Sequence, residues 1–115
     1  MIRVTATDTI RSGSADLFAA ARAEFERTGC LKLPALVDGA LLEQIFEAVD
    51  RAEWYERVHE GIGVELCARP GALTSALEFM LNDPALFALV GELTGCGRIG
   101  CFEGRVYRLS PGTGH

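Results

Sequence analysis

The chain has 115 residues, of which 49% are hydrophobic and 23% are charged, and its formal net charge is -5. This composition is that of one globular domain or part of one. The acidic balance and the absence of a basic run argue against nucleic acid or an anionic membrane as partner, because both are bound through clustered Lys and Arg. No apolar run approaches the ~18 residues that a membrane helix needs. Because no secretory signal is evident either, we predict a cytoplasmic protein.

The four cysteines fit neither a disulfide framework nor a zinc site. The chain is not cysteine-dense, and the C-x4-C pair near its end has no second Cys or His pair at zinc-site spacing. We therefore predict buried free thiols at Cys30, Cys67, Cys96 and Cys101.

Four stretches show the apolar spacing of an amphipathic helix, namely residues 16–28, 39–51, 73–82 and 84–94. Start and stop signals flank them. Ser14, Asp38 and Asp83 are suited to N-caps, and Pro84 follows at a first helical position. Gly29 and Gly95 are suited to end a helix in a left-handed conformation. The sequence therefore predicts a helical scaffold over residues 16–95.

The regions around these helices carry weaker signals. Residues 1–15 are predicted to be weakly ordered, with Ile2 and Val4 either in a short strand or in a frayed terminus. Leu31 and Leu33 would share one face of a short strand that ends at Pro34. Residues 56–72 are interpreted as a loop, with a short strand as an alternative at 64–67.

The last segment, residues 96–115, is rich in β-favouring side chains. If residues 98–110 form one strand, Arg105 and Tyr107 lie on one face and Arg108 lies on the other. A turn or bulge at Glu103-Gly104 is the alternative, and it would break that alternation.

The side chains that most strongly suggest a ligand-binding site are Arg105, Tyr107 and Arg108. Guanidinium groups grip a carboxylate in a bidentate manner, and a phenol can donate one more hydrogen bond. The alternative is an edge strand decorated with charge against aggregation.

The remaining motifs give no specific indication of a catalytic or binding site. The glycine pattern at 95–100 follows a helix and precedes a strand, which is the reverse of the dinucleotide-binding order. His59 and His115 are interpreted as surface histidines. Glu65, Glu78 and Glu103 are expected on solvated faces or in ion pairs with nearby Arg.

From about Phe25 to His115 the sequence resembles the N-terminal part of bacterial Fe(II)- and 2-oxoglutarate-dependent dioxygenases of the prolyl-hydroxylase-like branch. The residues that carry the resemblance are GCLKLPAL at 29–36, LLEQIFEAVDRAEW at 41–54, Asn82-Asp83-Pro84 and, above all, GRVYRLSPGTGH at 104–115.

The resemblance implies an α+β fold, with about four helices packed on a few strands, as in the front of a double-stranded β-helix, the cupin-like jelly roll. It implies Fe(II) and 2-oxoglutarate as cofactors of a complete enzyme. Such sites hold iron with an H-x-D or H-x-E pair and a distal His, and no such triplet occurs here. We therefore assign no catalytic residue and no metal ligand, and we expect neither cofactor to bind fully to this chain. In such enzymes the corresponding strand borders the cosubstrate pocket. The resemblance therefore assigns Tyr107, Arg108 and Arg105 to that border.

The leading hypothesis is thus a single, incomplete domain that is not catalytic by itself. A complete enzyme of this kind would hydroxylate or oxidise a small molecule or peptide. Its expected partner is a C-terminal part beyond His115 or a second chain paired with strand 98–110. The alternative is a small non-catalytic α+β module that binds another protein through that strand. A third hypothesis is a small-carboxylate binder that uses Arg105 and Arg108.

Overall fold

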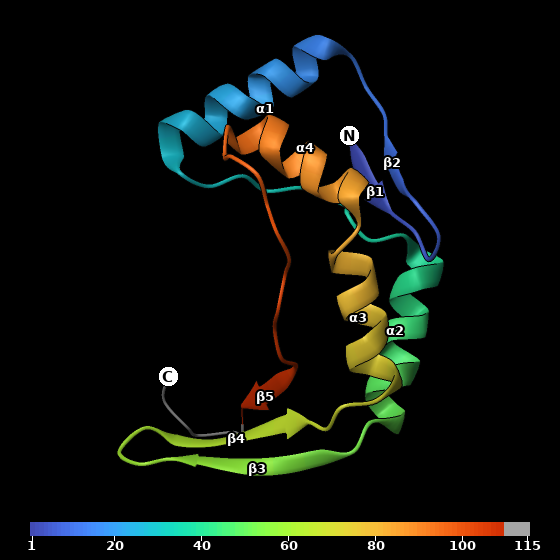
Figure 1. Ribbon diagram of the computed structural model, residues 1–115, viewed down its shortest axis with the longest axis vertical. Coiled ribbons are helices and arrows are strands. Elements are labelled where there is room, and N and C mark those ends of the chain that lie inside the picture. Colours follow the sequence, from blue (N-terminus) through green and yellow to red (C-terminus); the bar gives the residue numbers. More distant parts are fainter. Residues whose placement is uncertain (110–115) are drawn as a thin grey trace.

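The computed structural model describes residues 1–109, which form a mixed α+β fold with four helices and two small antiparallel sheets (Figure 1). The elements in chain order are β1 (Ile2–Val4), β2 (Thr9–Arg11), α1 (Ala15–Thr28), α2 (Gly39–Arg51), β3 (Trp54–His59), β4 (Gly63–Ala68), α3 (Ala72–Leu81), α4 (Pro84–Thr94) and β5 (Tyr107–Leu109).

The predicted helices are confirmed to within a residue or two, because their end signals act as expected. Ser14 accepts a hydrogen bond from the Leu17 backbone N–H at 3.3 Å, and Asp83 accepts one from that of Ala85 at 2.9 Å. Gly29 and Gly95 end α1 and α4 with φ values of 69° and 70°. This left-handed conformation favours glycine, and it lets each cap N–H reach a carbonyl of the preceding turn.

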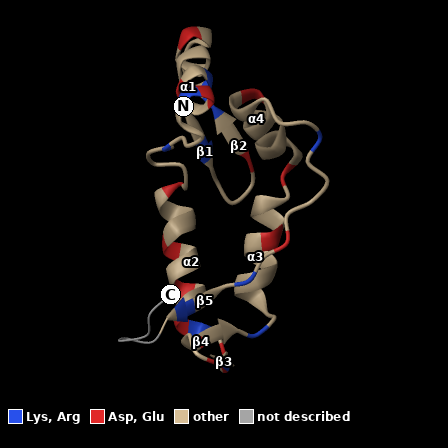
Figure 2. Ribbon diagram, turned by 90° about the vertical axis from the view of Figure 1, so that its left-hand side faces the viewer, with Lys and Arg blue, Asp and Glu red and all other residues tan. Residues whose placement is uncertain are grey.

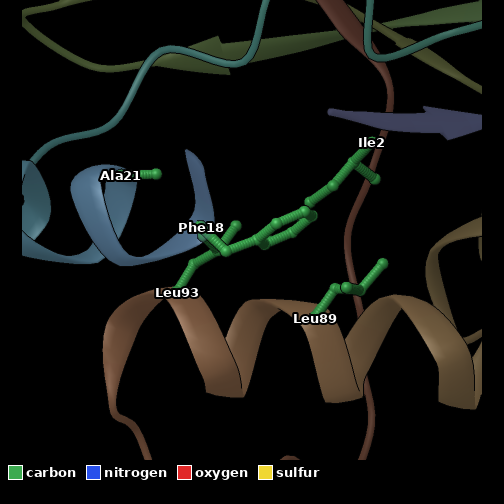
Figure 3. Packing of buried hydrophobic residues seen from close by; sticks show 5 residues of the cluster. All are labelled: Ile2, Phe18, Ala21, Leu89 and Leu93. Carbon is green, nitrogen blue, oxygen red and sulfur yellow. The ribbon is translucent and has the colours of Figure 1, made fainter. Parts of the chain in front are cut away.

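The hydrophobic core lies between α1 and α4, beside β1 (Figure 3). Leu93 is 2% exposed and Phe18 is 3% exposed, and Figure 3 shows both side chains in the space between the two helices. Ile2, Ala21 and Leu89 complete the cluster. Burial of this apolar surface joins elements that are distant in sequence, and a bidentate ion pair between Arg11 of β2 and Glu92 of α4 lies at its edge.

A second layer carries the three-stranded sheet. α2 and α3 pack side by side, and the sheet in the order β3-β4-β5 lies at the end of the molecule away from α1 and α4 (Figure 1). The molecule is therefore elongated, with extents of 46 × 32 × 25 Å.

The connection from α4 to β5 runs along this length. Asn82 fixes its midpoint by accepting a hydrogen bond from the Phe102 N–H at 2.7 Å and donating one to the Phe102 carbonyl at 3.0 Å.

The predictions about the first strands are confirmed in part. Of the two alternatives for Ile2 and Val4, the short strand is confirmed and the frayed terminus is wrong, because both residues are buried in β1, which pairs with β2. Residues 31–33 form no strand, and Leu31 and Leu33 pack against the core from an irregular segment. The segment 56–72 is mostly a hairpin and not a loop, and the alternative of a short strand at 64–67 is confirmed within β4.

The strand predicted over 98–110 is confirmed only at 107–109, and Ser110 lies outside the described residues. β5 pairs with only three residues of β4, Glu65 to Cys67. The polypeptide before it makes other contacts, including the two hydrogen bonds with Asn82 and one from the Ala68 N–H to the Val106 carbonyl at 2.8 Å. Residues 95–106 therefore form a connection and not a strand.

Within residues 1–109, no single helix has both the length and the apolar character needed to cross a membrane. α3 and α4 meet that test only when they are taken as a pair, which is bent by 53°.

Candidate functional site

The candidate site is built on the hairpin of β3 and β4. The two strands pair in antiparallel register from Trp54 opposite Ala68 to His59 opposite Gly63. The short connection turns through Gly61, whose φ of 76° suits glycine, and the Ile62 N–H donates to the His59 carbonyl at 2.9 Å. β5 then pairs along the other edge of β4. The sheet thus aligns polar side chains from three separate segments.

The register divides these side chains between two faces. Arg57 lies opposite Glu65, and Cys67 lies between Tyr55 and Tyr107, so these residues share one face. His59 is two residues from Arg57 and has the same orientation. We call this surface the polar face of the sheet. Figure 2 shows that basic and acidic stretches of the ribbon lie close together near β4 and β5.

Glu65 is at the centre of the polar face and is only 3% exposed. One of its oxygens, Oε1, lies 3.0 Å from Nε2 of His59, 3.0 Å from a guanidinium nitrogen of Arg105 and 3.9 Å from Nε of Arg57. The Cys67 thiol donates to the same oxygen at 3.4 Å. We call Arg57, His59, Glu65, Cys67 and Arg105 the Glu65 cluster.

The cluster stabilises the ionised form of Glu65. The hydrogen bond with His59 is the largest influence, and it lowers the pKa of Glu65. Burial alone would raise that pKa, since a low-dielectric environment disfavours charge, but the thiol contact and the charges of His59 and Arg57 also lower it. Glu65 is therefore a buried carboxylate that remains negative near neutral pH.

Cys67 does not act as a nucleophile in this arrangement. Its side chain is buried, and burial raises the pKa of its thiol, with the hydrogen bond to Glu65 adding to the shift. A neutral, buried thiol is a poor nucleophile. The predicted free thiols are confirmed, but the prediction of burial holds only for Cys67, because Cys30, Cys96 and Cys101 are exposed.

The structure brings together two of the three residues predicted to bind a carboxylate. Arg105 belongs to the Glu65 cluster, and its guanidinium lies 5.4 Å from the ring centre of Tyr107. Arg108 points to the other face, where it lies 4.9 Å from the ring centre of Trp54. Arg105 and Arg108 therefore cannot grip one small ligand together, as the third hypothesis required.

Four of the five residues of the cluster, all except Arg105, were not assigned to a site from sequence. Arg57 and Cys67 received no role in ligand binding, and His59 was interpreted as a surface residue, although its side chain is 29% exposed and contacts Glu65. The prediction that a scattered carboxylate pairs with Arg is confirmed for Glu65. A signal was present in the sequence, because Arg57, His59 and Glu65 alternate with other residues around the Gly61 turn.

The Glu65 cluster does not fit the iron implied by the resemblance. Glu65 already contacts two guanidiniums, and a divalent cation would have to displace them. Among residues 1–109, no group of three His, Cys, Asp or Glu side chains is arranged to hold a metal ion. The polar face does fit a carboxylate such as those of 2-oxoglutarate, because Arg105 and Tyr107 offer the donors that this group needs.

No protein-family model, curated protein or solved structure matches the chain.

Proposed function

We propose that the chain is the N-terminal portion of an Fe(II)- and 2-oxoglutarate-dependent oxygenase-like protein. In this proposal the helices and antiparallel strands form the front of a double-stranded β-helix. A complete enzyme would hydroxylate or otherwise oxidise a small molecule or peptide, with release of succinate and CO₂. The 115 residues alone would not turn over, because they contain no H-x-D or H-x-E triplet.

The observation that carries the proposal is the position of Arg105 and Tyr107 on the polar face. Both belong to the segment with the most distinctive resemblance, and both lie beside a buried carboxylate on an antiparallel sheet. The polar face would point into the β-helix, so that Arg105 and Tyr107 contact the cosubstrate. Arg108 would then lie on the outer face with Trp54. The helical elements that precede β5 agree with the expected helical front.

The reading frame beyond His115 tests this proposal at low cost. We expect an H-x-D or H-x-E triplet within about a dozen codons, since iron needs a His and a carboxylate close together on one strand. A stop codon directly after His115 would contradict the proposal.

Titration of the 115-residue chain with Fe(II) under anaerobic conditions gives a second test. We expect no tight, stoichiometric binding, because the carboxylate nearest to a histidine is already bound by guanidiniums. One tightly bound iron per chain would show that the metal site lies within these residues, and the proposal would then be wrong.

The exposed edge of β5 favours a second candidate function, a non-catalytic module that adds a partner strand. In residues 1–109, β5 is paired on one edge only, and Tyr107 and Leu109 are 51% and 44% exposed. An unpaired edge offers backbone donors and acceptors to another chain. This candidate predicts that the isolated chain dimerises or captures a β-strand peptide, which analytical ultracentrifugation would detect. A chain that stays monomeric at high concentration would argue against it.

A further inference from the structure

Glu65 is not part of a simple ion pair, because three basic side chains contact it and all three are more exposed than the carboxylate itself. One carboxylate oxygen accepts contacts from two guanidiniums and one imidazole. Glu65 is 3% exposed, whereas the side chains of Arg57, His59 and Arg105 are 44%, 29% and 46% exposed. The carboxylate thus forms the floor of the cluster, and the donors form a partly open rim above it.

The rim carries more positive charge than the floor can neutralise. Two guanidiniums face one carboxylate, which leaves one positive charge in excess before any proton on His59 is counted. Within residues 1–109, Glu65 is the only carboxylate within 4.0 Å of either guanidinium. Each guanidinium has five N–H donors, so several remain available to a ligand.

We propose that Arg57, His59 and Arg105 form a binding site for the carboxylate of a small organic acid, with Glu65 as its buried anchor. Glu65 holds the two long arginine side chains near one point, which reduces the conformational entropy that a ligand would otherwise have to remove. Guanidinium donors in this position match the planar, bidentate geometry of a carboxylate. The exposed Tyr107, beside Arg105, lies on the same face and can donate a further hydrogen bond.

This site reaches beyond the cosubstrate contacts proposed above, because Arg57 and His59 belong to β3. The site and the cosubstrate contacts have Arg105 in common. The inference rests on the proposed function only in the choice of which organic acid binds. Binding at this site needs no iron. A titration without metal therefore tests the site separately from the oxygenase assignment, and failure of one test does not decide the other.

The experiment is a calorimetric titration of the 115-residue chain with succinate at low ionic strength. We expect saturable binding that Arg57→Gln and Arg105→Gln each weaken about tenfold or more, since each removes a charge-assisted hydrogen bond. Arg108→Gln is the matched control, because it removes the same charge from the opposite face of the same sheet. We expect it to change the affinity less than about twofold.

Several results would overturn the inference. These are the absence of saturable succinate binding, an equal loss of affinity in the Arg108→Gln variant, or tighter binding of inorganic phosphate than of succinate. Circular dichroism of each variant checks that it is folded. Arg57→Gln is the safer variant in this respect, because Arg57 makes the longest of the three contacts with Glu65, at 3.9 Å.

Discussion

At the scale of single residues, Glu65 shows how a charge becomes buried in a small sheet. An unpaired carboxylate would be costly at 3% exposure, and a buried charge is tolerated when it is paired and hydrogen-bonded. Arg105 comes from the segment before β5, whereas His59 and Arg57 come from β3. The carboxylate on β4 therefore links all three parts of the sheet, and its protonation should weaken the link.

Acid should destabilise the protein through Glu65. The folded state lowers the pKa of this carboxyl below its ordinary value of 4.5, so the unfolded chain binds more protons in the interval between the two values. The stabilisation is present above that ordinary value and is lost as the pH falls through the folded-state pKa. We expect the thermal midpoint to fall less in Glu65→Gln than in the unaltered protein between about pH 5 and about pH 3.

Glu56→Gln is the matched control for this measurement, because Glu56 lies on the opposite face of β3, opposite Leu66, and is exposed. Its acid dependence should equal that of the unaltered chain. Equal acid dependence in Glu65→Gln as well would contradict the role assigned to the buried carboxylate.

The four thiols should separate into two classes of reactivity. Cys30, Cys96 and Cys101 are exposed, whereas Cys67 is buried and has a raised pKa. A thiol reagent at about pH 8 should modify three cysteines quickly and the fourth only after denaturant is added, because the thiolate is the reactive form. Mass spectrometry of the labelled peptides checks the assignment, and rapid labelling of Cys67 in the folded chain would disagree with it.

At the scale of elements, the helices were predictable because their signals are local. The N-caps at Ser14, Asp38 and Asp83, and the glycine ends of α1 and α4, act within one turn of chain. Of the β3–β4 hairpin, only β4 was anticipated, as the alternative strand at 64–67, whereas β3 and its pairing were missed although Gly61 marks the turn. The face of the hairpin that carries Glu65 also holds Arg57 and His59, so the usual alternation of apolar and polar residues is absent. The pairing depends on charge compensation by Arg105, about 40 residues later in sequence, and local patterns do not report such a contact.

The packing of α1 against α4 should supply much of the stability. Leu93 is 2% exposed within the core cluster, and Leu93→Ala should lower the free energy of unfolding by about 2–5 kcal/mol through lost burial and a cavity. Urea denaturation measures this change. Phe79→Ala is the control, because Phe79 is 77% exposed and its truncation should cost less than about 0.5 kcal/mol. If both variants lost a similar amount of free energy of unfolding, the packing of α1 against α4 would not be the main hydrophobic core.

At the scale of the whole molecule, the α+β class was predictable and the arrangement was not. The sequence contained the four helices, but the separation of a helical core from the sheet follows from contacts between distant segments, such as α1 with α4 and β4 with β5. The candidate site was predictable only in part. Arg105 and Tyr107 stood out by their residue types, whereas the role of Glu65 depends on three-dimensional convergence.

The proposed function predicts an enzymatic activity for the protein that is encoded by the whole reading frame containing this chain. Succinate release from 2-oxoglutarate, with added Fe(II), is the direct measurement. We expect succinate to form only when both iron and 2-oxoglutarate are supplied, and Tyr107→Phe to reduce the rate by loss of one hydrogen bond to the cosubstrate. A folded product that releases no succinate above the iron-free background would contradict the proposed function.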